Sequence, residues 1–121
     1  MSPNNVSGAD AEKLARAHLE AQGLSLISAN FTSRFGEIDL VMNDQSAIVF
    51  IEVRHRKNPS FGTALETVNR RKQKKLILAA QFFLQKKRWS NKDARFDVIG
   101  ISPNGSSGEL EYNWCKNAFL V

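Results

Sequence analysis

The sequence has little cysteine and no long apolar run, and each shortage excludes a class of protein. The single cysteine, Cys115, has no partner for an internal disulfide, which fits a reducing compartment. The longest apolar runs, residues 47–51 and 76–80, are far too short to span a bilayer. The N-terminal stretch has neither the basic region nor the apolar region of a secretory signal. We therefore expect a cytoplasmic protein that has no membrane partner.

Internal repeats, low-complexity segments and a second domain are also missing from the 121 residues. That length suits one domain with one hydrophobic core. Hydrophobic residues make up 42% of the chain, which is too high for a disordered tail. Residues 1–121 are therefore predicted to form a single domain.

Positive charge is in excess, with a formal net charge of +5. Of the 17 Lys and Arg residues, 12 lie between positions 54 and 92. A basic cluster of this kind favours a polyanionic partner, chiefly nucleic acid. On charge alone, a solvated surface that keeps the protein soluble explains the cluster equally well.

Residues 36–56 have the pattern of a β-hairpin with turn formers at 43–46. A loop at 44–45 or at 43–46 gives one pairing, with Met42 opposite Ala47 and Ile38 opposite Ile51. Because side chains alternate along a strand, one face is predicted to be apolar: Ile38, Leu40, Met42, Ala47, Val49, Ile51 and Val53. The other face mixes charged and apolar residues: Glu37, Asp39, Val41, Ile48, Phe50, Glu52 and Arg54.

In this register Glu37 lies opposite Glu52, and Asp39 is diagonal to Glu52, about 7–8 Å away at Cα. Such a cluster of acids is costly if it is buried and unpaired. Solvent can explain it, as can neutralising arginines: Arg34, Arg54 or Arg56. A divalent cation is the other explanation. Since all ligands would be oxygens, with no Cys or His cluster nearby, the cation would be Mg²⁺ or Mn²⁺ rather than zinc.

Helical periodicity predicts two helices. The first spans residues 8–22 behind a capping-box-like Ser7 and Asp10, and Glu12 borders its apolar stripe, facing either the hairpin or solvent. The second spans residues 69–87, and its first turns carry five cations: Arg70, Arg71, Lys72, Lys74 and Lys75. Cations there oppose the helix dipole, which indicates a phosphate-binding site unless the side chains simply point into solvent.

Three further strands are predicted, at residues 24–27, 95–102 and 110–114. Asp97 shares a face with Ile99 and Ile101, so we expect it to bond a nearby backbone group or arginine. The apolar residues at 118–120 are expected to dock on the core. Together these elements predict an α/β fold with a central mixed sheet flanked by helices.

Several segments carry a resemblance to a known family: GADAEKLARAHLEAQG, GEIDLV, FIEVRHR, FGTALETV, RRKQKKL, RFDVIGI and the terminal NAF. They resemble the YraN family of small bacterial proteins over nearly the whole chain and in the same order. The layout of Asp39 followed by Glu52-Val53-Arg54 also resembles the PD-(D/E)XK nuclease core. The family is placed by similarity in the restriction-endonuclease-like superfamily, among Holliday-junction-resolvase-like proteins.

The resemblance implies a restriction-endonuclease-like, nuclease-like domain that binds DNA or RNA and Mg²⁺ or Mn²⁺. Asp39 and Glu52 would be metal ligands and catalytic acids, with Glu37 and Glu12 as additional acids. Arg54 stands where the motif has lysine, and it would face the scissile phosphate. The nucleic-acid-binding residues would be Arg54, Arg56, Arg70, Arg71, Lys72, Lys74 and Lys75.

Three functions remain open from the sequence. The first is a metal-dependent endonuclease of DNA repair or recombination. The second is a nucleic-acid-binding module that does not hydrolyse, because arginine replaces the motif lysine and is bulkier and will not give up its proton. The third is a protein-interaction domain whose acids pair with arginines.

Overall fold

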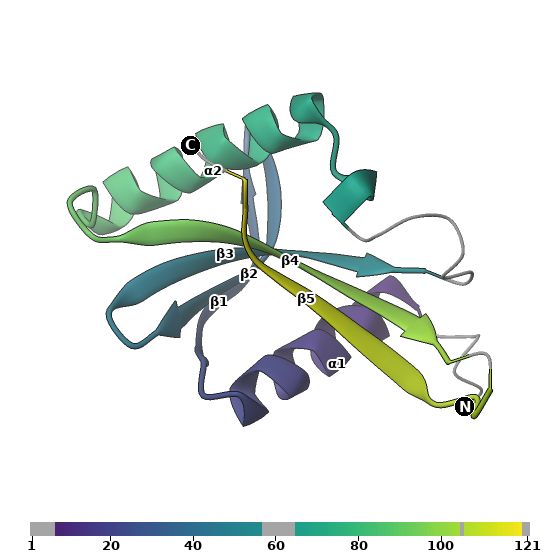
Figure 1. Cartoon of the computed structure of the whole chain (residues 1–121). Coiled ribbons are helices and arrows are strands. Elements are labelled where there is room, and N and C mark those ends of the chain that lie inside the picture. Colours follow the sequence, from purple (N-terminus) through teal and green to yellow (C-terminus); the bar gives the residue numbers. More distant parts are fainter. Residues whose placement is uncertain (1–6, 57–64, 105, 120–121) are drawn as a thin grey trace.

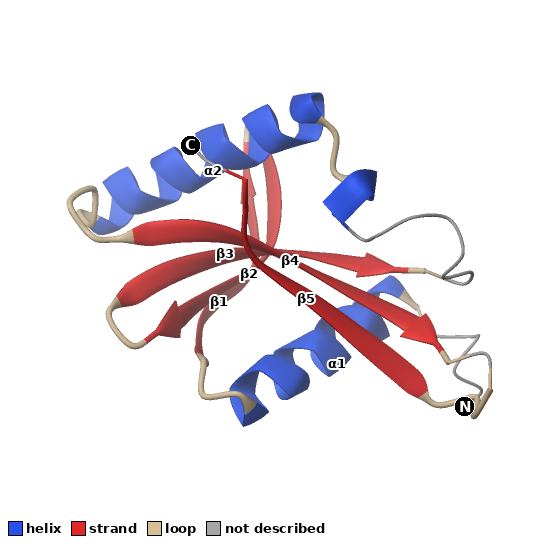
Figure 2. Cartoon of the chain, in the orientation of Figure 1, coloured by secondary structure: helices blue, strands red, loops and turns tan. Residues whose placement is uncertain are grey.

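The computed structural model describes residues 7–56, 65–104 and 106–119. A five-stranded sheet has the strand order β1-β2-β3-β4-β5, with only β3 and β4 parallel. The strands are β1 (Ser25–Ser33), β2 (Gly36–Asp44), β3 (Ala47–His55), β4 (Ala94–Pro103) and β5 (Leu110–Phe119). Helix α1 (Gly8–Ala21) covers one face, and α2 (Arg70–Lys87) covers the other (Figure 1, Figure 2). The predicted α/β fold with a mixed sheet is confirmed.

Both helices begin where their capping residues indicate. The Ser7 hydroxyl accepts the Asp10 N–H, and the Asn69 side chain accepts the Lys72 N–H. Helix α1 buries three residues against the sheet: Ala11, Ala15 and Leu19. Helix α2 buries four: Leu76, Ala79, Ala80 and Phe83. Helix α2 is the crossover that lets β3 and β4 run parallel.

The predicted hairpin register is wrong by two residues. Met42 pairs with Val49 and Leu40 with Ile51, around a two-residue loop at Gln45 and Ser46. The turn formers Asn43 and Asp44 lie in the strand instead, and the Asp44 carboxylate accepts a 2.9 Å hydrogen bond from Arg95. Gln45 takes the left-handed backbone (φ 58°) that a two-residue loop requires.

A two-residue shift keeps the side chains of β3 on their predicted faces, but β2 departs from simple alternation. Leu40 and Met42 pack in the core under α1, whereas Ile38 packs in the core under α2 together with Val41. The expected apolar face is therefore wrong at Ile38. Pairing of β2 with β3 ends at Leu40 and Ile51, so the two strands separate where the acids follow.

The remaining strands are longer than predicted. β1 is one continuous edge strand rather than a short run at 24–27, and β5 continues to Phe119, which pairs with Phe96. A short 3₁₀ helix, η2 (Leu65–Thr67), precedes α2. The sequence also predicts a loop at 57–62, from its breaker residues, and a helical region that starts at about 63. These two segments and Leu120 lie outside the described residues. Neither α1 nor any other helix in the described ranges is long and apolar enough to cross a membrane.

Candidate metal and nucleic-acid site

Asp39 lies where β2 and β3 separate. Its Oδ2 atom accepts the Val53 backbone N–H at 2.8 Å, so a side chain replaces the strand-to-strand hydrogen bond there. This bond holds the Asp39 carboxylate at the gap between the strands. From the gap it reaches acids of its own strand, of α1 and of β3.

Glu12 and Glu37 meet Asp39 on the side of the sheet that α1 covers. Carboxylate oxygens of all three lie within 4.8 Å of one another. Burial raises the pKa of Glu12, and the Asp39 charge, a hydrogen bond with Asp39 and the Glu37 charge raise it further. Asn30 opposes the shift by a hydrogen bond. Of the two sequence-based alternatives for Glu12, the structure shows the one that faces the hairpin.

Glu52 approaches Asp39 from β3 and is only 5% exposed. Burial, a hydrogen bond with Asp39 and the charge of Asp39 raise the pKa of Glu52 to about 8. Lys72 and Arg54 oppose the shift by their charges. The predicted pairing of Glu37 with Glu52 is wrong, because the two-residue shift brings Asp39 to Glu52 instead. We call Glu12, Glu37, Asp39 and Glu52 the acid site.

Lys72, in the first turn of α2, forms an ion pair with the acid site. Its Nζ lies 3.5 Å from Glu52 Oε2, and its side chain is 38% exposed. The pair meets at ion-pair distance, yet the buried Oε2 atom makes no hydrogen bond with any described residue. The sequence places Lys72 both among the phosphate-binding cations and on the helical stripe that continues through Leu76, Ala79 and Phe83. Its position one turn before the buried Leu76 was the signal that it faces the sheet.

Arg54, which stands in the motif lysine position, is directed at η2. Its Nη2 donates to the Thr67 carbonyl at 3.4 Å, while its buried Nε has no hydrogen-bond partner among the described residues. Arg34, another suggested neutraliser, instead lies over the Phe35 ring at 4.9 Å. Arg56 donates its backbone N–H to Ile101 at the end of β3.

The other cations in the first two turns of α2 form an exposed surface beside the acid site. They are Arg70, Arg71, Lys74 and Lys75. Lys75 packs beside Gly36, where an added Cβ would lie 3.8 Å from the lysine Cβ. Gly36 directly precedes Glu37, so this packing joins the basic surface to the acids. On the α1 side, a hollow of about 210 Å³ borders Glu12.

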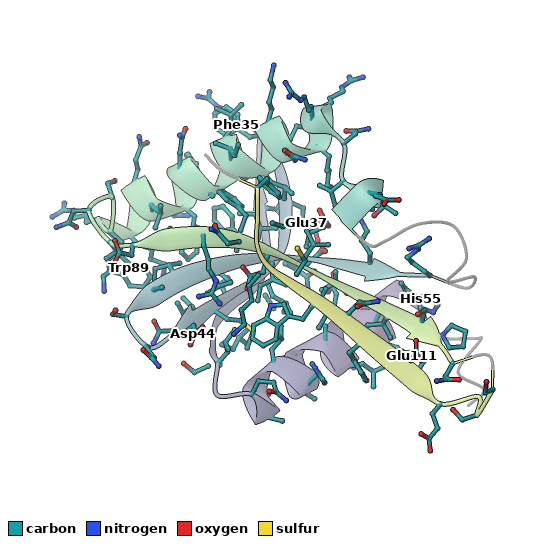
Figure 3. All side chains as sticks on the ribbon, viewed as in Figure 1. Phe35, Glu37, Asp44, His55, Trp89 and Glu111 are labelled. Carbon is teal, nitrogen blue, oxygen red and sulfur yellow. The ribbon has the colours of Figure 1, made fainter. Side chains whose placement is uncertain are left out.

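The donors of the acid site are all carboxylate oxygens drawn from α1, β2 and β3. Figure 3 shows Glu37 near the middle of the molecule, between the two helices. A donor set of this kind suits Mg²⁺ or Mn²⁺. The buried Glu52 Oε2 atom, which lacks a hydrogen bond within the described part of the chain, fits a ligand position for such an ion.

Comparison with known proteins points to one family. The model of "Uncharacterised protein family UPF0102" matches residues 11–101, a stretch that contains the whole acid site and Lys72. A UPF0102 protein of Stutzerimonas stutzeri is 49% identical over 120 residues, covering 98% of each chain. One of Pseudomonas fluorescens is 49% identical over 114 residues, covering 93% of this chain and 92% of that protein. One of Pseudomonas aeruginosa is 44% identical over 113 residues, covering 93% and 90%.

Proposed function

This chain belongs to the uncharacterised protein family UPF0102, and we propose that it is a nucleic-acid-binding protein with a Mg²⁺- or Mn²⁺-dependent phosphodiester-hydrolysing site. The proposal includes kinship with PD-(D/E)XK nucleases, whose paired acids correspond to Asp39 and Glu52. The observation that carries it is the convergence of the Glu12, Glu37 and Asp39 carboxylates at one gap in the sheet, with the buried Glu52 beside Asp39.

The energetics of the acid site support a cation as its partner. Like charges at this spacing repel, and burial adds to the cost, as the raised pKa values of Glu12 and Glu52 reflect. A protein that needed only a stable sheet would gain by replacing such acids with apolar residues. A divalent cation would offset the repulsion among the carboxylates, and its binding would explain why these acids lie together.

The proposed roles follow from position. Asp39 and Glu52 would hold the ion, while Glu37 and Glu12 would complete or support its oxygen shell. When bound, the ion would stabilise phosphate charge and lower the pKa of an attacking water. Lys72, beside Glu52 at the start of α2, would place its ammonium against the same phosphate. The exposed cations of α2 would bind neighbouring phosphates of the strand.

A binding module without hydrolysis is the second candidate. The Arg54 hydrogen bond to Thr67 favours it, because a guanidinium engaged with η2 is poorly placed to follow the charge of a reacting phosphate. The Lys72–Glu52 ion pair favours a third, a protein-interaction domain in which the acids need no metal.

One assay separates the three candidates. The protein is incubated with branched, single-stranded and duplex DNA and RNA, in Mn²⁺ and in EDTA, with Asp39→Asn as the control for contaminating nucleases. Mn²⁺-dependent cleavage lost in Asp39→Asn supports the hydrolase. Salt-dependent binding without cleavage supports the module, and absence of both supports the interaction domain.

Binding itself has a quantitative signature. With roughly four to six phosphates neutralised, log K for duplex DNA should fall with log salt at a slope of about −4 to −5. Reversing Arg71, Lys74 and Lys75 to Glu should weaken binding to every sequence. A salt-independent affinity would contradict nucleic-acid binding through the α2 surface.

A further inference from the structure

We propose that the middle of α2, together with the turn between β1 and β2, binds an unstacked nucleobase. The inference rests on the proposed nucleic-acid binding and adds a feature of the ligand: a strand with an accessible base. The site is a hollow of about 150 Å³, which we call the aromatic patch. It is lined by Arg34, Phe35, Leu78, Gln81, Phe82 and Gln85.

The first observation is exposed apolar surface. Among the described residues, the exposed large hydrophobic side chains are Leu78 (44%) and Phe82 (37%), one helical turn apart. They lie on the outer face of α2, away from the buried Ala79 and Phe83. A single exposed apolar residue needs no explanation, but a pair beside a hollow is a candidate binding surface.

The second observation is that the Phe82 ring is held in place. It contacts Phe35 edge-on at a centroid distance of 6.2 Å, and it contacts Phe31 at 6.2 Å. Phe31 in turn packs edge-on against the buried Phe83 at 5.0 Å. A ring supported in this way loses little conformational freedom when a ligand stacks on it.

The third observation is the polar rim. The Arg34 guanidinium, 4.9 Å from the Phe35 ring centroid, presents a planar cation that also stacks on bases. The exposed amides of Gln81 and Gln85 each offer a donor and an acceptor, as a base edge requires. A purely apolar ligand would leave these groups without partners.

Helical spacing places the aromatic patch and the exposed cations of the first turns along one face of α2. Exposed residues follow one another at intervals of three or four from Arg71 through Lys74 to Leu78 and Phe82. At a rise of 1.5 Å per residue, Lys74 and Phe82 are about 12 Å apart along the axis. One short oligonucleotide can therefore place a phosphate on the lysine and a base on the ring. Figure 3 shows Phe35 beside α2, and Gly36 separates it from Glu37 of the acid site.

Charge also favours a nucleic acid over a second copy of the chain. Arg34, Arg71, Lys74 and Lys75 surround or adjoin the patch, so two copies meeting there would bring like charges together. A nucleic-acid strand is negatively charged, so the same cations would attract it. Stacking on an aromatic side chain tolerates any base, because every base has a π-face.

The test compares a single-stranded oligonucleotide with an abasic strand of the same length and with a duplex. Phe82→Leu keeps apolar volume but removes the ring. It should bind the normal single strand at least about fivefold more weakly than the parent, with an unchanged salt slope. The parent should show the same loss on the abasic strand, and Phe82→Leu no further loss there. Duplex affinity should not change.

Lys74→Gln is the matched control on the same helix face. It should weaken normal and abasic strands alike and reduce the single-strand salt slope by about 0.7. The abasic comparison uses the parent protein, so it holds even if Phe82→Leu folds poorly. Phe82→Trp, which keeps a stacking ring, should restore binding.

The outcomes separate this inference from the proposed function. A parent that binds normal and abasic strands equally overturns the base site but leaves nucleic-acid binding standing. A parent that binds no strand at all overturns both. A change in sedimentation coefficient of the free protein on Phe82→Leu would identify the patch as an interface between copies, which also overturns the base site.

Discussion

Asp97 and Glu52 are both buried acids on neighbouring parallel strands, yet their surroundings differ completely. Asp97 accepts hydrogen bonds from the Arg95 guanidinium at 3.0 Å, the Trp114 indole at 2.9 Å and the Asn117 N–H at 2.9 Å. Glu52 has Lys72 at 3.5 Å and another carboxylate as its neighbour. Folding alone satisfies Asp97, whereas it leaves Glu52 in need of a proton or a cation.

The contrast between Asp97 and Glu52 distinguishes structural acids from functional ones. A buried carboxylate with a full set of donors ties elements together, as Asp97 ties β4 to β5. A buried carboxylate that the fold leaves poorly paired is a candidate for ligand binding. Substitutions at the two kinds of acid should therefore have different effects on stability and on metal binding.

The largest effect is expected at Asp97. Asp97→Asn should lower the free energy of unfolding by about 3–5 kcal/mol, because Arg95 loses a buried partner and the amide cannot accept all the bonds. Urea denaturation measures the loss, which should be the same with and without Mn²⁺. A loss below about 1 kcal/mol would show that the Asp97 network is not what holds β5.

The next effect concerns metal. Asp39→Asn and Glu52→Gln should each abolish Mn²⁺ binding measured by calorimetry, since each removes a direct ligand charge. Mn²⁺ should raise the melting temperature of the parent and of Asp44→Asn, a matched acid outside the site, but not of the two site variants. If both site variants bind Mn²⁺ like the parent, the acid site holds no metal.

The raised pKa of Glu52 predicts that the stability of the protein depends on pH. Its pKa is raised from 4.5 to about 8 in the folded protein. Its contribution to stability is therefore fully present below about pH 4.5 and is lost as the pH rises through 8. Without metal, Glu52→Gln should gain stability relative to the parent between pH 6 and pH 9, by about 1 kcal/mol or more. Equal pH profiles from chemical denaturation would contradict the protonated, poorly paired state of Glu52.

The smallest effect in binding is expected at Arg54. Arg54→Lys should change nucleic-acid affinity by less than about tenfold, or about 1.4 kcal/mol, while raising Mn²⁺-dependent cleavage. The reason is that a compact ammonium leaves more room for an attacking water than the planar guanidinium does. Asp39→Asn in the Arg54→Lys background must remove any activity gained. Rapid Mn²⁺-dependent cleavage by the parent, lost in Arg54→Lys, would contradict this prediction and show that Arg54 itself supports the reaction.

Much of the fold was predictable because its signals are local. Ser7 and Asn69 begin the helices, and periodicity identifies their buried faces. The bonding of Asp97 to arginine and backbone groups is also confirmed. The predicted hairpin register is wrong because two registers that differ by two residues place the β3 side chains on the same faces. The Asp44–Arg95 bond, which joins residues 51 positions apart, helps to hold the observed register.

Local signals along the chain suffice to show which segments form helices and strands and that Asp39 and Glu52 belong to one hairpin. The meeting of Glu12 from α1 and Lys72 from α2 with this hairpin, from opposite sides of the sheet, follows only from how the elements pack. Alternation and helical phase give only the direction in which a side chain leaves its own element. Which side chains converge depends on where β2 and β3 separate and on how each helix packs over that gap.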